Sequence, residues 1–211
     1  MKIVFAIPVL LVSFVFAACS STSYDDPTEE ETINVDWGST DLQTFSQKMA
    51  DSLLAAPGLS YLANPNKGND QRVVAYMGGI SNETSEHINT RDIMRKLTTA
   101  LVQSGKIRVV ADEAGQEELG EQVRFQQGSG RVDPAEAKAF GKQKGAEVVV
   151  YGSLSSIEKK KGRSLENLGG KSKDVYYLFV LNCVNIESSE LLWSEEAEIN
   201  KAQRTSLFGA E

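Results

Sequence analysis

The chain has almost none of the side chains from which catalytic and metal sites are usually built. Its 211 residues include one histidine, His87, and two cysteines, Cys19 and Cys183. A structural zinc site needs four ligands, so these three residues are too few. A Ser-His-Asp arrangement is formally possible, but His87 lies in a polar segment and no Gly-x-Ser-x-Gly motif supports it. We therefore expect no catalytic residue, no metal site and no cofactor.

The chain also has fewer basic than acidic residues. Lys and Arg number 22 against 29 Asp and Glu, which gives a net charge of −7. Proteins that bind nucleic acid depend on Lys and Arg to neutralise phosphates, so we expect no nucleic-acid partner. The chain has no internal repeat, and its length suits one domain with a core of its own.

The N-terminus has the layout of a secretory signal. Lys2 is followed by an uncharged run, Ile3 to Ala18, which is shorter than the ~20 apolar residues of a membrane-spanning helix. The run ends in Phe16-Ala17-Ala18-Cys19, which resembles a bacterial lipobox with Phe16 where Leu is usual. Residues 1–18 are thus predicted to be a lipoprotein signal peptide, and the alternative is an ordinary secreted protein with a free cysteine.

Cys19 is therefore predicted to carry the lipid anchor. Each buried methylene contributes ~0.8 kcal/mol, so two or three acyl chains hold a protein on a membrane almost permanently. Ser20 follows the cysteine, and in bacterial lipoproteins the absence of Asp at this position favours the outer membrane. We expect a lipid-anchored protein on the periplasmic face of the outer membrane. Cys183 then has no partner for a disulfide, and its alternating apolar run indicates a small buried hydrophobe.

The remaining chain divides into a tether and one folded unit. Residues 19–38 comprise the lipidated cysteine and a polar stretch with little to bury, which predicts a short disordered tether. Residues 39–211 are predicted to form the globular domain.

Hydrophobic periodicity predicts the elements of this domain. A first helix begins with a capping box, Thr40 and Gln43, and ends before Pro57-Gly58. A second helix runs from Thr90 to Gly105, a surface helix covers 112–127, and a fourth helix runs from Asp133 to Gly145. Strands are predicted at 72–77, 107–110, 148–151, 175–186 and 191–193. This order indicates an α/β fold with a single mixed sheet flanked by helices, its last strands antiparallel.

Two of these strands carry further information. Val148 to Tyr151 is apolar at four successive positions, which predicts a strand with both faces covered. In 175–186 apolar residues lie on both faces of the predicted strand. One face carries Val175, Tyr177, Phe179, Leu181 and Cys183, and the other carries Tyr176, Leu178, Val180 and Val184.

A basic cluster stands out in this acidic chain. It lies in the predicted connection between two strands and comprises Lys159, Lys160, Lys161, Arg163, Lys171 and Lys173. One interpretation is a solvated loop. The other is a docking patch for an acidic protein surface, with Tyr176 beside it, because charge of one sign speeds and orients association. On the second interpretation the partner-binding residues are Lys159, Lys160, Lys161, Arg163, Lys173 and Tyr176.

Four sequence blocks in order resemble the LpoB family of outer-membrane lipoproteins. They are Gly79–Asn89, Leu101–Ile107, Gly141–Ile157 and Leu181–Ser194, and the resemblance extends over residues 39–211. It implies a domain similar to the N-terminal domain of TolB. It also implies a non-catalytic role: docking on a bifunctional, class A penicillin-binding protein and activating its glycan polymerisation and peptide cross-linking. The tether here is shorter than in the best-known members, and Ser164–Gly170 adds length to the basic connection.

We accordingly expect a monomer that activates a peptidoglycan synthase by protein contact. Two other functions remain open at this point. One is a structural or export-accessory envelope lipoprotein with a TolB-like domain, and the other is a cell-wall hydrolase, for which two of the many carboxylates could serve.

Overall fold

The computed structural model describes residues 26, 29–30, 34–62, 68–135, 145–162 and 170–205. One five-stranded sheet runs through this part of the chain, in the order β2-β1-β3-β4-β5. The strands are β1 (Val73–Glu83), β2 (Ile107–Val109), β3 (Val148–Lys161), β4 (Lys171–Asn185) and β5 (Leu191–Thr205). The helices are α1 (Ser39–Ala55), the short 3₁₀ helix η1 (Pro57–Tyr61), α2 (Thr90–Ser104) and α3 (Glu113–Gly128).

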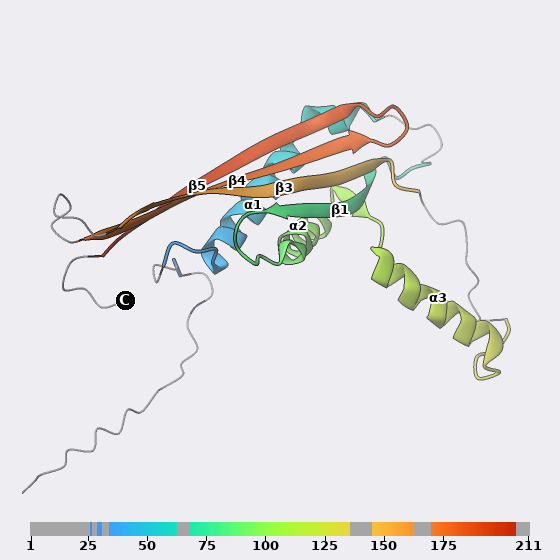
Figure 1. The fold of residues 1–211 in the computed structure, drawn as a ribbon. Helices are drawn as coiled ribbons and strands as arrows, with labels where there is room; N and C mark the ends of the chain where they lie inside the picture. Colours follow the sequence, from blue (N-terminus) through green and yellow to red (C-terminus); the bar gives the residue numbers. More distant parts are fainter. Residues whose placement is uncertain are drawn as a thin grey trace, which may run out of the picture.

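The sheet is mixed, as predicted. β1 pairs in parallel with β2 and β3, whereas β3, β4 and β5 pair antiparallel. In the described residues α1 and α2 lie against one face, and α3 projects away from the sheet (Figure 1). The α/β class with one mixed sheet is therefore confirmed, and helical cover is present on one face. No helix of the described part is long and apolar enough to cross a membrane.

β3 and β5 are much longer than predicted, and β4 begins four residues earlier than predicted. Their extra length consists largely of Ser, Glu and Lys, which resemble loop residues when the sequence is read alone. In the structure these residues are paired across strands, down to Lys161 opposite Ser172 and Lys171 opposite Thr205. The prediction that the basic cluster lies in the connection between two strands is therefore wrong for five of its six residues, because Lys159, Lys160 and Lys161 belong to β3 and Lys171 and Lys173 to β4.

The start of α1 also differs from the prediction. The residue before the helix is Gly38, whose backbone N–H donates to the Asp41 carboxylate at 2.9 Å. A carboxylate in the first turn satisfies a free N–H and favours the positive end of the helix dipole. The capping box proposed for Thr40 and Gln43 is thus wrong. The inward face is as predicted, with Phe45, Met49 and Leu53 buried.

The second helix follows its prediction closely. It begins at Thr90, whose hydroxyl donates to the Ile80 carbonyl at 2.7 Å. Ile93, Leu97 and Leu101 are fully buried. Gly105 ends the helix with φ +66°, a left-handed conformation that glycine adopts without strain.

The core lies between the sheet and the two packed helices, α1 and α2. From β4, Val175, Tyr177, Phe179, Leu181 and Cys183 point into it and are at most 1% exposed, which confirms that these five residues share one face. Burial raises the pKa of the Cys183 thiol to about 11, as suits its role as a small hydrophobe.

The face of the sheet opposite α1 and α2 is called the open face below. Val148 and Val150 point into the core, but Tyr151 lies on the open face and is 43% exposed. The prediction that both faces of this strand are covered is therefore not met within the described residues. The fourth predicted helix begins at Asp133, whose carboxylate accepts from the Ala135 N–H at 2.9 Å. Its remainder, 136–144, lies outside the described residues, as do the signal peptide, Cys19 and most of the tether.

Candidate functional site

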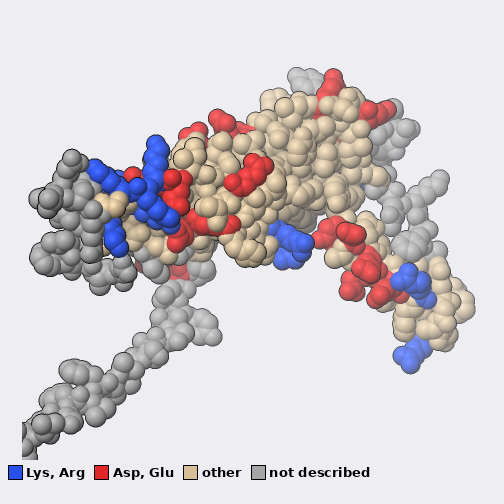
Figure 2. Space-filling view, in the orientation of Figure 1, with Lys and Arg blue, Asp and Glu red and all other residues tan. Residues whose placement is uncertain are grey.

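The far ends of the three long strands carry most of the basic residues singled out in the sequence. β3, β4 and β5 extend well beyond α1 and α2 at this end (Figure 1). Figure 2 shows Lys and Arg side chains gathered there, with Asp and Glu directly beside them. The question for function is which of these charges are already neutralised within the domain.

Strand geometry divides the lysines into two sets, because successive side chains of a strand point to opposite faces. Lys160 lies opposite Lys173, and both point to the same face as the buried Val175. Lys159 lies opposite Asp174, and Lys161 lies opposite Ser172. These two lysines point to the open face.

The lysines on the helix side are held in ion pairs. Lys173 binds Asp36 and also lies 3.1 Å from Glu158, which Lys160 contacts at 2.9 Å. Lys160 and Lys173 together lower the pKa of Glu158, and the Asp36 carboxylate raises the pKa of Lys173. Lys173 is therefore neutralised within the domain, with its side chain 28% exposed, whereas Lys160 contacts Glu158 from an exposed position.

One of these contacts, between Lys173 and Asp36, fastens the segment that precedes α1. Residues 34–38, assigned to the tether from sequence, pack on the domain with Val35 only 4% exposed. Lys201 of β5 donates to the Asp36 carbonyl at 2.6 Å and to the buried Asp41 carboxylate at 2.9 Å. The Trp37 ring stacks on Phe45 with ring centroids 5.4 Å apart. The segment thus joins the domain at the basic end of the sheet.

The lysines on the open face are different. Lys159 and Lys161 are exposed and have no acidic partner among the described residues. Asp174, which lies opposite Lys159, is bound by Arg204 instead. Two positive charges therefore remain available on this face of an acidic protein.

An apolar side chain adjoins these two charges. Ile157 is 59% exposed and lies directly opposite Tyr176 on the open face. Tyr176 is half-buried, and desolvation together with the Glu198 carboxylate raises the pKa of its hydroxyl. We call Ile157, Lys159, Lys161 and Tyr176 the distal patch. It combines an exposed aliphatic group, an aromatic ring and two cations. Aromatic rings are enriched at protein interfaces, and exposed cations speed and orient association with an acidic surface.

The structure therefore brings together part of the predicted set. Lys159, Lys161 and Tyr176 share one face, Lys160 and Lys173 lie on the other, and Arg163 lies outside the described residues. Ile157 was missed by sequence reasoning. Its spacing of two from Lys159 would have placed it on the same face, had the segment been recognised as strand.

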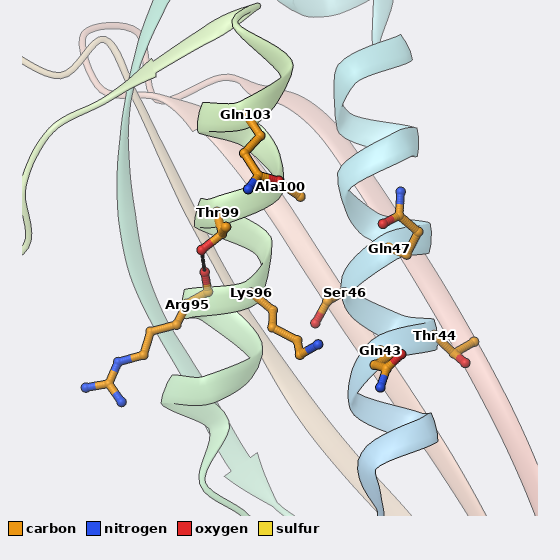
Figure 3. Close-up of a pocket in the computed structure, with 9 residues that line it drawn as sticks. All are labelled: Gln43, Thr44, Ser46, Gln47, Arg95, Lys96, Thr99, Ala100 and Gln103. Atoms are coloured by element: carbon orange, nitrogen blue, oxygen red, sulfur yellow. Dashed lines mark hydrogen bonds between the residues drawn. The ribbon is translucent and has the colours of Figure 1, made fainter. Parts of the chain in front are cut away.

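The structure offers no catalytic arrangement in its described part. His87 is exposed and makes no hydrogen bond there, and no group of three potential metal ligands occurs there. A wide depression of about 590 Å³ lies between α1 and α2 (Figure 3). Its lining includes amides and the cations Arg95 and Lys96 but no carboxylate or imidazole, so it lacks a general base. The hydroxyls of Ser46 and Thr99 are already bonded to backbone carbonyls at 2.7 and 2.9 Å.

Comparison with solved structures finds distant similarity to LpoB. The LpoB C-terminal domains from Salmonella enterica and Escherichia coli each match at 16% identity, with TM-scores of 0.43 and 0.44. Each match covers 76% of this chain and 99% of the other. The lipoprotein GNA1162 from Neisseria meningitidis matches at 16% identity and a TM-score of 0.36, over 62% of this chain and 83% of that one. No curated protein sequence matches the chain.

The family assignment rests on a sequence model of the family. The model described as "Peptidoglycan-synthase activator LpoB" matches residues 41–199, which is most of the chain and nearly all of the described domain. Its description is that of an activator of an enzyme, and such a role agrees with an envelope lipoprotein. The chain belongs to the LpoB family of peptidoglycan-synthase activators.

Proposed function

We propose that this protein is an outer-membrane lipoprotein, anchored through Cys19, that activates a bifunctional penicillin-binding protein as a monomer by docking on it with the distal patch. The observation that carries this proposal is the pair Lys159 and Lys161. In a chain with a net charge of −7 these two cations have no partner in the described domain and lie beside an exposed isoleucine. An acidic surface with an apolar centre is the matching partner.

The mechanism follows from binding alone. A ligand shifts a conformational equilibrium only by the difference in its affinity for the two states. Docking therefore raises synthase activity if the distal patch binds the more active conformation more tightly. The two lysines contribute mainly to the rate and orientation of encounter. Burial of Ile157 contributes affinity, ~1–2 kcal/mol for a side chain that starts half exposed.

The place where the tether joins the domain bears on where the distal patch lies relative to the outer membrane. Residues 34–38 are fastened at the basic end by Lys173 and Lys201. The fifteen residues from Ser20 to Asn34 span at most ~50 Å when fully extended. A short tether that joins the same end of the sheet as the distal patch, on the opposite face, limits how far that patch lies from the outer membrane. The synthase then has to present its docking surface within that distance.

Activation is tested with the full-length lipoprotein in detergent and a purified class A synthase. We expect wild type to accelerate glycan polymerisation and peptide cross-linking. Replacing Lys159 and Lys161 by Gln should weaken this effect, and Ile157→Ser should weaken binding about tenfold, equivalent to ~1.4 kcal/mol. The matched control is Lys96→Gln with Lys106→Gln, two exposed lysines elsewhere that give the same change in charge. Failure of wild type to accelerate any class A synthase contradicts the proposed function, whereas equal loss in both double variants contradicts only the assignment of the patch.

The anchor has its own test. Cys19→Ala removes the thiol that would be acylated, so the precursor should keep its signal peptide and take up no labelled palmitate. Membrane fractionation with palmitate labelling measures both. A variant that is labelled and sorted to the outer membrane like wild type would exclude Cys19 as the anchor.

A similarity in fold to a domain outside the LpoB family is a further part of the proposal. We propose that the domain is similar to the N-terminal domain of TolB, on the basis of its mixed sheet with antiparallel C-terminal strands. Superposition of the two sheets, strand by strand, tests this. A different strand order in TolB would contradict it.

A further inference from the structure

The outer part of β3 is an edge of the sheet as well as part of its open face. β1 and β3 pair as far as Glu83 and Ser155. From residue 156 onwards, β3 pairs only with β4 in the described part of the chain, and it continues well beyond the end of β1 (Figure 1). Residues 157–161 are all exposed. Glu158 is exposed although its side chain is only 26% exposed, so its backbone is open to solvent.

A turn held by side chains takes β1 away from this edge. The Asn82 amide oxygen accepts from the Thr84 N–H at 3.0 Å and from the Thr84 hydroxyl at 2.7 Å. The Asn82 amide nitrogen donates to the Glu86 carbonyl at 2.9 Å. Side-chain bonds of this kind replace the bonds of a strand ladder. The chain is therefore fixed in a course that leads into α2 and leaves the outer part of β3 without a neighbour on that side.

The backbone groups on the free edge belong to every second residue. A methyl group added to Gly78 of β1 would lie 3.0 Å from the Val150 carbonyl oxygen, so this carbonyl points towards β1. Backbone groups of alternate residues point the same way, and the pairing of β3 with β4 has no bulge. The N–H and C=O of Ser156, Glu158 and Lys160 therefore point away from β4. Among the described residues these groups have no hydrogen-bond partner.

An unpaired strand edge is a template for a strand of another chain, which it binds through backbone hydrogen bonds. We propose that the synthase adds an extended acidic segment to the sheet at this edge, beside residues 156–161 of β3. The inference rests on the function proposed above and specifies how the distal patch is engaged. On the open face, side chains of the added strand lie beside Ile157, Lys159 and Lys161. An apolar residue followed at alternate positions by Asp or Glu fits them.

Charge favours such a segment over a second copy of this chain. Three successive lysines, residues 159–161, lie along the edge. Two copies that paired there would bring these cations together, and like charges on opposite residues destabilise a sheet. Lysines on an edge are a common protection against edge-to-edge association. Carboxylates beside Lys159 and Lys161 turn the same charges into an attraction. The edge thus discriminates between its own copy and an acidic strand.

A proline at the edge tests the backbone contribution. Lys160→Pro removes an N–H that points outwards and preserves the pairing with β4, because strand edges tolerate proline where its nitrogen faces solvent. Lys160→Ala is the matched variant, which loses the same side chain but keeps the N–H. Binding of the full-length lipoprotein in detergent to an immobilised class A synthase is measured for both. We expect Lys160→Pro to bind about tenfold more weakly than Lys160→Ala, since a hydrogen bond is lost and the ring obstructs the added strand. Equal affinities would overturn the proposal.

The opposite edge of the sheet supplies the control for proline itself. On β5 the Glu196 carbonyl accepts from the Lys48 ammonium of α1 at 3.0 Å and so points away from β4. Ala202, six residues further on, has the same orientation and is exposed. Ala202→Pro should bind the synthase like wild type. Circular dichroism and urea unfolding check that each variant is folded. Equal weakening by Ala202→Pro and Lys160→Pro would overturn the proposal, because the effect would not be specific to the β3 edge.

Hydrogen exchange tests the same edge without any substitution. In the free lipoprotein, the N–H groups of Glu158 and Lys160 should exchange fast. Bound synthase should slow both at least about tenfold, with smaller changes at Lys159 and Lys161, whose N–H groups are already bonded to β4. Mass spectrometry with residue-level fragmentation measures these rates.

The outcomes separate this inference from the function on which it rests. Binding of the synthase without slower exchange at Glu158 and Lys160 would overturn strand addition and leave the proposed function standing. Slow exchange at these two residues in the concentrated lipoprotein alone would overturn it in favour of a second copy. Failure of wild type to bind any class A synthase would contradict the proposed function and this inference together.

Discussion

Tyr177, on β4, donates a hydrogen bond of 2.5 Å to the Glu86 carboxylate in the loop that leads into α2. The other oxygen of Glu86 accepts from the Trp37 backbone N–H at 2.9 Å. One carboxylate thereby links β4, the loop before α2 and the segment that precedes α1. The entry of the chain into the domain is fixed by this link and by the lysine contacts at the basic end.

Tyr177→Phe should therefore destabilise the domain without disturbing its packing. The variant keeps the ring but removes the hydroxyl, and hydrogen bonds to charged groups contribute about 1.5–3 kcal/mol. Urea unfolding followed by circular dichroism measures the change in the free energy of unfolding. Tyr151→Phe is the control, because Tyr151 is exposed on the open face. Equal stability of the two variants would show that the Glu86 link contributes nothing.

Stability should also fall at alkaline pH. Burial raises the pKa of Cys183 to about 11 in the folded domain, whereas a thiol in an unfolded chain titrates near ~8.5. The unfolded state therefore releases its proton first. The contribution of the thiol is fully present below pH ~8.5 and is lost progressively up to about 11. Burial and Glu86 raise the pKa of Tyr177 as well, which adds a loss above pH ~10.

The measurement is the urea midpoint at pH ~8 and pH ~10. Cys183→Ala should show a shallower fall than wild type over this interval, although it starts from lower stability because a buried atom is lost. Both proteins in the comparison carry Tyr177→Phe, so that the titration of this tyrosine does not contribute: one keeps Cys183 and the other has Cys183→Ala. An unchanged pH slope in the alanine variant would contradict burial of a neutral thiol.

Sequence reasoning predicted the core better than it predicted the basic end. The apolar run in 175–186 identified β4 as a strand, and strand geometry placed Val175 to Cys183, taken at every second residue, on one face. Residue type did not show which face is inward, because the residues of the other face, Tyr176, Leu178 and Val180, are apolar too. The outer half of β3, Ser155 to Lys161, has a single large apolar residue, Ile157. This segment is strand because β4 pairs with it along its whole length, and a long-range pairing leaves no local signal.

At the candidate site, sequence reasoning likewise identified some features and missed others. Composition identified the lysines as unusual in an acidic chain. It could not separate Lys160 from Lys159, since their difference depends on the face to which a strand turns each of them. Nor could it identify Asp36 and Asp41 as ion-pair partners of Lys173 and Lys201, because the partners are more than 130 residues apart.

Among the ion pairs described, removing one partner of the Lys201–Asp41 pair should lower the free energy of unfolding most. The Asp41 side chain is 5% exposed and the Lys201 side chain 17% exposed. Lys201→Met leaves a buried carboxylate without its cation, which should cost ~3 kcal/mol in the free energy of unfolding. Adding Asp41→Asn should recover part of that loss, because the uncompensated charge is then removed.

The control for that experiment is Arg204→Met. Arg204 pairs with Asp174 at an exposed position, where such pairs contribute ~1 kcal/mol or less. Thermal or urea unfolding of the three variants measures the difference. Equal losses for Lys201→Met and Arg204→Met would mean that burial does not strengthen the first pair.

The two lysines of the distal patch should act mainly on the rate of association with a synthase. Lys159→Glu with Lys161→Glu reverses charge on the open face, so binding to an immobilised class A synthase should slow in its association phase, with a smaller change in dissociation. Raising salt from low to physiological concentration should slow wild type towards the rate of this variant, because exposed charges are screened over ~8–10 Å. Folding should persist, since surface substitutions usually change stability by ~0.5 kcal/mol or less. Lys96→Glu with Lys106→Glu makes the same change in net charge elsewhere and should retain most of the wild-type rate. If both double variants slow association equally, net charge governs the encounter and the distal patch is not the docking surface.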